Sequence, residues 1–311
     1  MKAAQAYYLS LHMVLAVSLA TGCGRQDASL PSDQGRQSHG HGSTPQDARN
    51  AGEAVETPSS TCPLPPVLAL DLGGRIKMDL LLIPSGSFLM GGAGGEDDAK
   101  PVHEVTIGEP FYIGKYKVTQ EQWQAVMGSN PSEFKGPRNP VDSVGWEDCR
   151  RFLKKLNEKF ADASVRFSIP TEAQWEYACR AGSKAKYCYG NAEASLAEFA
   201  WFYDNSGEKT HPVGGKKPNA WGLYDMHGNL FEWCADWYSG DYYKSSPARD
   251  PCGPASGTLH VDRGGCWNSV ARGCCSAFRN TNSPRPDHLI GLRVVANCAG
   301  STPKPSPEKP R

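Results

Sequence analysis

The clearest periodic pattern in the chain runs from residue 146 to residue 160, where apolar side chains recur every three or four positions. On a helix these side chains share one face, while Asp148, Arg151, Lys155 and Glu158 point away from it. The apolar positions are Trp146, Cys149, Phe152, Leu153, Leu156 and Phe160. A stripe of this width is typical of a helix on a hydrophobic core, so we predict one long helix here with its apolar face buried.

Two shorter helices are indicated by their start signals. Residues 119–122 and 171–174 both read Thr-x-x-Gln, a capping box in which the Thr hydroxyl and the Gln side chain each bond a free backbone N–H of the first turn. Short apolar runs elsewhere have the character of strands. They predict strands at 80–84, 87–90, 102–107, 166–169 and 292–295.

Composition favours an irregular arrangement of these elements. The 311 residues include 33 Gly and 24 Pro, so turns are many and long helices few. Lys plus Arg and Asp plus Glu both number 33, which gives a formal net charge of zero. No long-range field then steers the chain toward nucleic acid, which we do not expect as a partner. We predict an irregular, loop-rich α+β domain over 65–298.

The N-terminal segment predicts export. Lys2 precedes an apolar run from Leu9 to Ala20, which has the length of a signal-peptide core and is too short to span a bilayer. Small residues then lead to Gly22 and Cys23, similar to a bacterial lipoprotein processing site at which Cys23 is lipidated and anchors the chain to the membrane. The alternative is an ordinary secretory signal. Both place the protein outside the cytoplasm, in the periplasm or on the cell surface.

The segments that flank the predicted domain differ from it in composition. Residues 1–23 are the predicted lipoprotein-type signal peptide. Residues 24–64 are rich in Ser, Gly, Gln, Asp and Pro, with few large apolar side chains, and are predicted to be a disordered tether. The Pro-rich end, 299–311, is predicted to be a disordered tail.

The cysteine count agrees with export. The chain has eleven cysteines, and if Cys23 is the anchor the ten that remain are an even number. Disulfides are the default state of such cysteines in an oxidising compartment, so we expect most of them to be paired. Spacing does not give their connectivity.

Oxygen-bearing residues within the aromatic stretch 221–238 form a candidate cation site. Asp225 and Glu232 supply carboxylate oxygens, and Gly228 allows a sharp turn that aims backbone carbonyls inward. Hard oxygen ligands of this kind are those that Ca²⁺ prefers. The alternative is a capped turn in which Asn229 bonds its own backbone and the tryptophans fill the core. The residues alone leave both interpretations open.

Several motifs, in a fixed order, resemble those of a known family. They are FLMGG from Phe88, PVHEVTI from Pro101, FYIGKYKVTQEQW from Phe111, IPTEAQWEYACRAG from Ile169, the stretch 221–238, DRGGCWNSVARGCCSAFRN from Asp262 and GLRVV from Gly291. Each motif alone is weak, but their order is specific. From Asp79 to Asn297 the chain resembles the formylglycine-generating enzyme, or sulfatase-modifying factor, domain family. The resemblance implies an irregular α+β fold with a C-type-lectin-like core.

The resemblance places an altered cysteine pair after the RGG motif. Active members of the family have RGGS and then two cysteines that bind copper and act on the substrate thiol. This chain has Cys266 at the position of that Ser and Ser269 at the position of the first cysteine, so that Cys274 alone matches the second. Soft thiolates select Cu(I), and a hydroxyl does not replace one. A copper site would therefore have to be rebuilt from Cys274 with Cys266 or Cys275.

The calcium hypothesis agrees with the resemblance. Family members bind Ca²⁺ through side-chain oxygens at the positions of Asp225 and Glu232 and through backbone carbonyls at those of Gly228 and Leu230. All four positions are compatible in this chain. One structural calcium ion is expected, and its binding would contribute to the folding free energy of a loop-rich domain.

Two functions follow from these observations. The first is a lipid-anchored, calcium-stabilised binding or accessory module without oxidase activity. In the family's enzymes the segment after RGGS lines the groove for a sulfatase peptide, so its altered residues imply an altered protein or peptide ligand, with a sulfatase among the candidates. The expected ligand surface is Trp267, Asn268, Ser269, Arg272, Phe278 and Asn280. The alternative is a copper-dependent formylglycine-generating oxidase, with Cys274 catalytic, that acts on a sulfatase cysteine.

Overall fold

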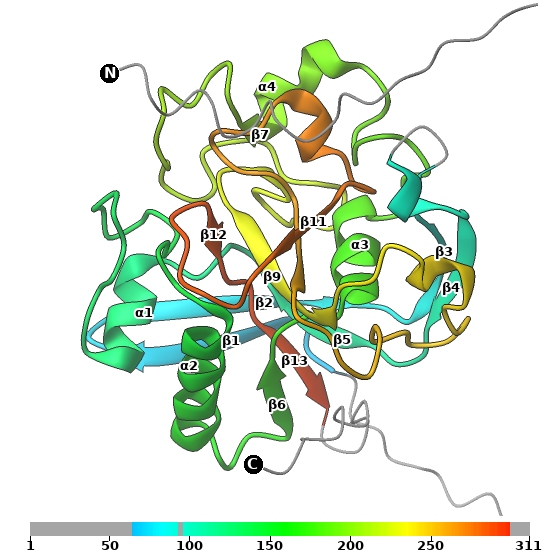
Figure 1. Ribbon diagram of the computed structural model, residues 1–311. Coiled ribbons are helices and arrows are strands. Elements are labelled where there is room, and N and C mark those ends of the chain that lie inside the picture. The colour runs from blue at the N-terminus through cyan, green and yellow to red at the C-terminus, as the bar shows by residue number, and fades with distance from the viewer. Residues whose placement is uncertain (1–63, 93–95, 299–311) are drawn as a thin grey trace, which may run out of the picture. The chain divides into compact units, whose positions relative to one another are not determined.

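The largest sheet joins the first and last described parts of the chain. The computed structural model describes residues 64–92 and 96–298, and five antiparallel strands pair in the order β1-β2-β5-β13-β6 (Figure 1). They are β1 (Val67–Gly73), β2 (Ile76–Ile83), β5 (Phe111–Gly114), β13 (Val295–Cys298) and β6 (Val165–Ser168). Strand β13 therefore lies between two strands that come much earlier in the sequence.

A second sheet brings the two most informative motifs together. Its strands lie in the order β11-β10-β9-β12, and all pair antiparallel except β12, which is parallel to β9. They are β9 (Phe231–Trp237), β10 (His260–Arg263), β11 (Arg279–Asn282) and β12 (Ile290–Gly291). In this register Arg263 of β10 lies opposite Glu232 of β9 and Arg279 of β11.

Two small ribbons complete the described strands. Strand β3 (Gly86–Met90) pairs antiparallel with β4 (His103–Ile107), and β7 (Ala200–Trp201) pairs parallel with β8 (His227–Gly228). Strand β8 of the second ribbon comes directly before β9 in the chain. It fixes the turn that contains the predicted calcium ligands.

The helices are few and short, as the composition predicts. They are α1 (Gln120–Met127), α2 (Trp146–Lys159), α3 (Glu172–Arg180) and α4 (Leu196–Phe199). Both predicted capping boxes are confirmed. The side chains of Thr119 and Thr171 accept from the backbone N–H groups of Gln122 and Gln174, and each Gln side chain accepts from the backbone N–H of its Thr. The long amphipathic helix is confirmed as α2, which packs against α1 and β6.

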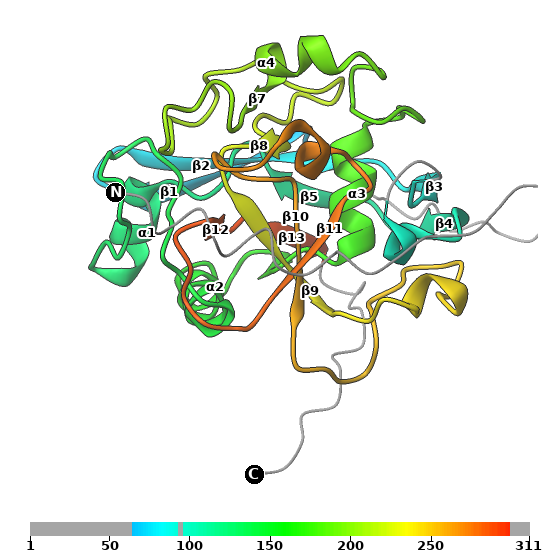
Figure 2. The same cartoon turned by 45° about the horizontal axis from the view of Figure 1, so that its top comes forward.

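Helix α3 connects the β3–β4 ribbon to the second sheet. All nine of its residues are buried, and it contacts β3, β4, β9 and β10 (Figure 2). A helix with polar residues on every face is buried only if those residues find partners. Charged side chains of α3 do so by pairing with arginines of β10 and β11, as described below.

The predicted α+β class is confirmed, with one misplaced strand. Strands β2, β3, β4 and β6 lie within a few residues of the predicted ones, whereas the prediction at 292–295 overlaps only the first residue of β13. Leu292 and Val294 still accept backbone hydrogen bonds from Val118 and Gly114. The side chain of Arg293, between them, forms a buried ion pair with Glu232.

Predictions for the two ends of the chain lie largely outside the described residues. These are the signal peptide at 1–23 with its lipidation site Cys23, the tether at 24–64 except its last residue, and the tail at 299–311. Within residues 64–92 and 96–298, no helix has both the length and the apolar character needed to cross a bilayer.

Candidate functional site

Five of the six predicted ligand-surface residues lie in the connection between β10 and β11, which contains the 3₁₀ helix η4 (Ala271–Cys274), and Asn280 lies on β11. Gly264 and Gly265 open this connection with φ of +100° and +78°, a left-handed backbone that favours glycine. A Cβ on Gly265 would lie 2.6 Å from Sγ of Cys274. The glycine pair thus allows the chain to fold back closely over the Cys274 thiol.

Ser269, at the position of the family's first cysteine, stabilises this turn. Its Oγ accepts a hydrogen bond from the backbone N–H of Cys266 at 2.9 Å and lies 3.3 Å from Sγ of Cys266. The Cys266 side chain is buried, and burial raises its pKa to about 11. The thiol and the hydroxyl have exchanged places relative to the family motif, and the thiol now faces the interior.

Cys274, the candidate catalytic thiol, is fully buried. Burial raises its pKa well above the ordinary value for a thiol. The neighbouring Cys275 also has a raised pKa because of burial, and its Sγ lies 3.9 Å from the carbonyl oxygen of Ala271. Since the thiolate is the nucleophile and the metal ligand, none of the three candidate thiols is activated in this arrangement.

The predicted disulfides are not confirmed among the described cysteines. Cys149 on the buried face of α2 and Cys266 lie in one core cluster, Cys179 and Cys234 lie in a second cluster around α3, and Cys274 and Cys275 lie in a third. Among the described residues, eight cysteines are free thiols: Cys149, Cys179, Cys188, Cys234, Cys252, Cys266, Cys274 and Cys275. Cys234 and Cys274, which belong to the two main motifs, lie in different clusters and do not pair.

The structure divides the six predicted ligand-surface residues into two groups. Asn268 and Arg272 are exposed, and Ser269 and Phe278 are half-buried. Trp267 is buried, and its ring makes an edge contact with Phe134 at a centroid distance of 5.5 Å. Asn280 is half-buried and committed to the fold, because its Nδ2 donates to Asp262 Oδ1 at 2.7 Å. The accessible part of the surface is therefore the first half of the connection.

Two exposed residues that the sequence did not single out complete this accessible part. Val270 is 60% exposed and Tyr203 is 55% exposed, and they are the two most exposed large hydrophobic side chains of the described residues. They are neighbours, because the Tyr203 backbone N–H donates to the carbonyl of Ser269 at 2.9 Å. The only sequence signal for Tyr203 is its place in an aromatic run before a polar turn. We name Tyr203, Asn268, Ser269, Val270 and Arg272 the η4 surface.

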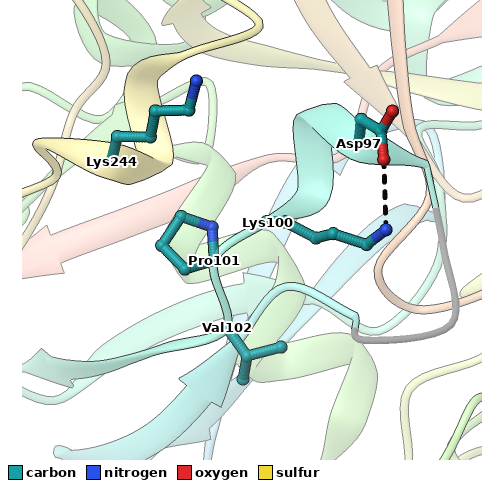
Figure 3. A pocket seen from close by; sticks show the side chains of 5 residues that line it. All are labelled: Asp97, Lys100, Pro101, Val102 and Lys244. Carbon is teal, nitrogen blue, oxygen red and sulfur yellow. Dashed lines mark hydrogen bonds and ion pairs between the residues drawn. The ribbon is translucent and has the colours of Figure 1, made fainter.

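A large open depression lies near the η4 surface but does not include it. It has a volume of about 730 Å³ and is lined by Asp97, Lys100, Pro101, Val102 and Lys244. Figure 3 shows Lys100 turned toward Asp97, with which it pairs at 3.1 Å. Arg272 reaches toward this region, because its guanidinium pairs with Glu96, the residue before the 3₁₀ helix η1 (Asp97–Ala99). None of the lining residues was predicted as a site residue.

The predicted calcium ligands lie between Asp225 and the start of strand β9. Gly228 is the last residue of β8, and Glu232 is the second residue of β9. Asp225 and Gly228 have φ of +56° and +86°, and a Cβ on Gly228 would lie 2.2 Å from the carbonyl oxygen of Trp201. Asn229 does not bond its own backbone here, since its side chain bridges to His211 through the backbone N–H and carbonyl of that residue. Asp225, Gly228, Leu230 and Glu232 are all buried.

The Glu232 carboxylate is already fully bonded. It accepts from Arg293 Nε and Nη2 at 2.9 Å each, from Trp175 Nε1 at 2.7 Å and from Lys117 Nζ. Burial alone would raise the pKa of Glu232, but the charges of Arg293 and Lys117 lower it to about 2. This carboxylate is ionised at every physiological pH and carries two cationic partners.

Asp225 is bonded on one side only. Its Oδ2 accepts from the Gly214 backbone N–H at 2.8 Å, whereas the buried Oδ1 has no hydrogen-bond partner. Burial raises the pKa of Asp225. Ca²⁺ needs six to eight oxygen ligands, but within the described part of the chain no group of three or more Asp, Glu, His or Cys side chains is placed to hold a metal ion. The Glu232 oxygens that a calcium ion would need are bonded to Lys117 and Arg293, so the donors present in this turn do not fit that ion.

The arginines of the last motifs are structural. Arg293 pairs with Glu232 at 2.9 Å. Arg263 and Arg279 instead pair with carboxylates of α3, Arg279 Nε with Glu172 Oε1 at 2.7 Å and Arg263 with both Glu172 and Glu176. All three guanidinium groups are buried, so none is available to an acidic ligand.

Comparisons with known proteins agree with the motif order. The sulfatase-modifying factor enzyme 1-like domain matches residues 75–298. The chaperone protein LppX of Paenibacillus barcinonensis is 31% identical over 270 residues, which cover 71% of this chain and 90% of that protein. The formylglycine-generating enzyme of Thermomonospora curvata is 29% identical over 297 residues, which cover 72% of this chain and 95% of that enzyme.

Among solved structures, Treponema denticola variable protein 1 has a similar fold. It superposes with a TM-score of 0.69 and 32% sequence identity, and the match covers 76% of this chain and all of that one. Relatives with different names are thus about equally similar to this chain. Overall similarity does not distinguish their functions, so the residues of the site must.

Proposed function

Because the chain belongs to the sulfatase-modifying factor enzyme 1-like domain family and lacks that family's paired thiols, we propose that it is a binding or accessory module and not a formylglycine-generating oxidase. The observation that carries this proposal is the bonding of Ser269. Its hydroxyl stands where the first catalytic thiol would be, and it accepts from the Cys266 backbone as part of the turn.

The chemistry of the remaining thiols supports the same conclusion. A Cu(I) site in this position depends on two thiolates that reach the same point. Cys274 and Cys266 are both buried with raised pKa values, so binding copper would require the loss of protons that burial retains. The alternative, a rearranged copper oxidase, depends on Cys266 or Cys275 joining Cys274 as a second sulfur ligand.

The η4 surface supports a protein or peptide ligand. Exposed Tyr and Val side chains lie beside exposed Asn268 and Arg272, and Tyr and Arg are residue types that interfaces favour. An extended peptide buries such side chains without a deep cavity. A sulfatase segment is the ligand that the family suggests. The relative LppX is named a chaperone protein, which supports an accessory role toward another protein.

The location is also part of the proposal. The apolar run before Cys23 supports export and a lipid anchor at a bacterial membrane, on the periplasmic side or at the cell surface. A tether over 24–64 would hold the domain away from the bilayer.

Binding is tested by fluorescence anisotropy with a labelled peptide that contains Cys-x-Pro-x-Arg. This is the sequence around the sulfatase cysteine on which oxidases of the family act. We expect the purified protein to bind it and the double variant Tyr203→Ala, Val270→Ser to lose about tenfold in affinity, because both changes remove apolar contact area. Leu89→Ala is the control, since Leu89 is 46% exposed but lies on β3. Absence of binding by the wild type, or equal affinity of all three proteins, would contradict the proposal.

A further inference from the structure

Lys117 is a lysine that the fold has taken completely out of water. It lies between β5 and α1, and its side chain has no exposed surface. The backbone on its C-terminal side is fixed, because the Val118 N–H donates to the Leu292 carbonyl at 2.8 Å and Val118 accepts from Val141 at 2.8 Å. Burying an ammonium is costly unless a charge and hydrogen bonds compensate it.

The compensating groups are the two carboxylates predicted to hold calcium. The ammonium of Lys117 bonds Glu232 Oε1 directly, and the Asp225 carboxylate attracts it as well. Arg293 faces the same carboxylate and also donates to the carbonyl oxygens of Gly114 and Tyr224, at 2.7 Å and 2.8 Å. Lys216 also interacts with the Asp225 charge, and its ammonium lies over the ring of Trp201 at 3.8 Å.

Charge balance shows what Lys117 does in this group. With Lys117, the buried set contains two carboxylates, Asp225 and Glu232, and two cations, Lys117 and Arg293. Without it, the set would carry one negative charge in excess, and Glu232 would lose one of its cationic partners. A set with excess negative charge and oxygen donors is what attracts a metal ion.

We propose that the Lys117 ammonium is the resident cation of the turn from Asp225 to Glu232 and takes the place of a structural calcium ion, so that this domain folds without a divalent metal. A compact ammonium with three donors supplies one positive charge and can bond oxygens directly. The proposal concerns the fold alone and does not depend on the ligand of the η4 surface.

The first test uses the wild-type protein in EDTA and in excess CaCl₂. We expect the same melting temperature in both, within about 1 °C, because a ligand that does not bind the native state does not stabilise it. Equilibrium dialysis against ⁴⁵Ca²⁺ is expected to show no tightly bound ion. One tightly bound calcium per chain, or a melting temperature that falls in EDTA, would overturn the proposal.

The second test removes the ammonium. Lys117→Ser is expected to lower the melting temperature in EDTA by about 10 °C, because a buried carboxylate loses a partner, and to recover part of that loss in CaCl₂. Lys117→Met, which keeps the stem and fills the space, is expected to be destabilised without recovery. Lys115→Ser is the matched control, since Lys115 lies over the ring of Tyr116 and outside the buried set. Lack of any calcium response in folded Lys117→Ser would contradict the proposal, and the wild-type test still decides it if the variants do not fold.

Discussion

The hydroxyl of Ser269 and the thiol of Cys266 lie 3.3 Å apart in one tight turn. The family motif has the same two groups in exchanged positions, with the thiol at residue 269. Cys266 is 2% exposed, whereas Ser269 is half-buried at the η4 surface. The sulfur of Cys266 therefore lies in the core and a hydroxyl lies at the more accessible position, as the proposed binding module without oxidase activity requires.

This exchange predicts the reactivity of a restored thiol. We expect Ser269→Cys to gain one rapidly reacting thiol in the native protein, because residue 269 is partly accessible and Cys266 and Cys274 are not. Titration with Ellman's reagent at neutral pH, with and without denaturant, measures it. Ser276→Cys is a control at a fully buried position. An equal native thiol count in wild type and Ser269→Cys would show that residue 269 is not accessible.

The buried cations predict a large effect of neutralising Glu232. Glu232→Gln leaves Lys117 and Arg293 facing each other without a negative charge, which we expect to reduce the free energy of unfolding by about 3–5 kcal/mol. Glu198→Gln is the control, since Glu198 pairs with Lys217 at the surface and a surface pair contributes about 0–1 kcal/mol. Urea unfolding monitored by tryptophan fluorescence compares them. Similar midpoints for the two variants would argue against a stabilising role of the buried set.

The pKa of Glu232 also predicts how the free energy of unfolding changes at low pH. The folded-state pKa of Glu232 is about 2, below the ordinary value of about 4.3 for the unfolded chain. Its contribution to stability is therefore complete above the unfolded value and is lost as the pH falls through about 2. The difference in unfolding free energy between wild type and Glu232→Gln should shrink below pH 4. A difference that stays constant down to pH 2 would contradict this assignment.

The pKa of Asp236 predicts that the protein loses stability as the pH rises, the opposite of the effect of Glu232. Burial, with repulsion from Glu172, raises the pKa of Asp236 to about 8, so the folded protein keeps a proton that the unfolded chain has lost above about pH 4. The contribution of Asp236 to stability is therefore present below the unfolded value and is lost as the pH rises through about 8. Asp236→Asn, which can still accept from the Glu172 N–H, should be more stable than wild type at pH 8 and lose that advantage near pH 4. Equal pH profiles of the two proteins would contradict the raised pKa.

Local signals in the sequence predicted the local structure well. Each Thr-x-x-Gln box, and the apolar stripe of α2, involves residues that are close together in the sequence. These local patterns therefore suffice to predict the three helices. Strand β9 was not predicted. Its first four residues are all buried, and a strand covered on both faces lacks the alternation that distinguishes a strand from a core segment.

The parts of the site that were missed depend on long-range contacts. Lys117 and Glu232 are 115 residues apart, and no local pattern shows that a lysine before α1 points at a carboxylate of β9. Tyr203 is exposed because, within residues 64–92 and 96–298, no other segment packs over it, which the sequence does not reveal. Trp267 was predicted as a surface residue but packs against Phe134 from a distant loop.

One assay decides whether the protein has oxidase activity. The purified protein is titrated with Cu(I), then incubated in air with a Cys-x-Pro-x-Arg peptide, and the peptide is followed by mass spectrometry for aldehyde formation. The formylglycine-generating enzyme of Thermomonospora curvata serves as the positive control. We predict no tight stoichiometric copper and an unchanged peptide. Copper-dependent conversion of the peptide cysteine to formylglycine would contradict the account and identify Cys274, with Cys266 or Cys275, as a rearranged active site.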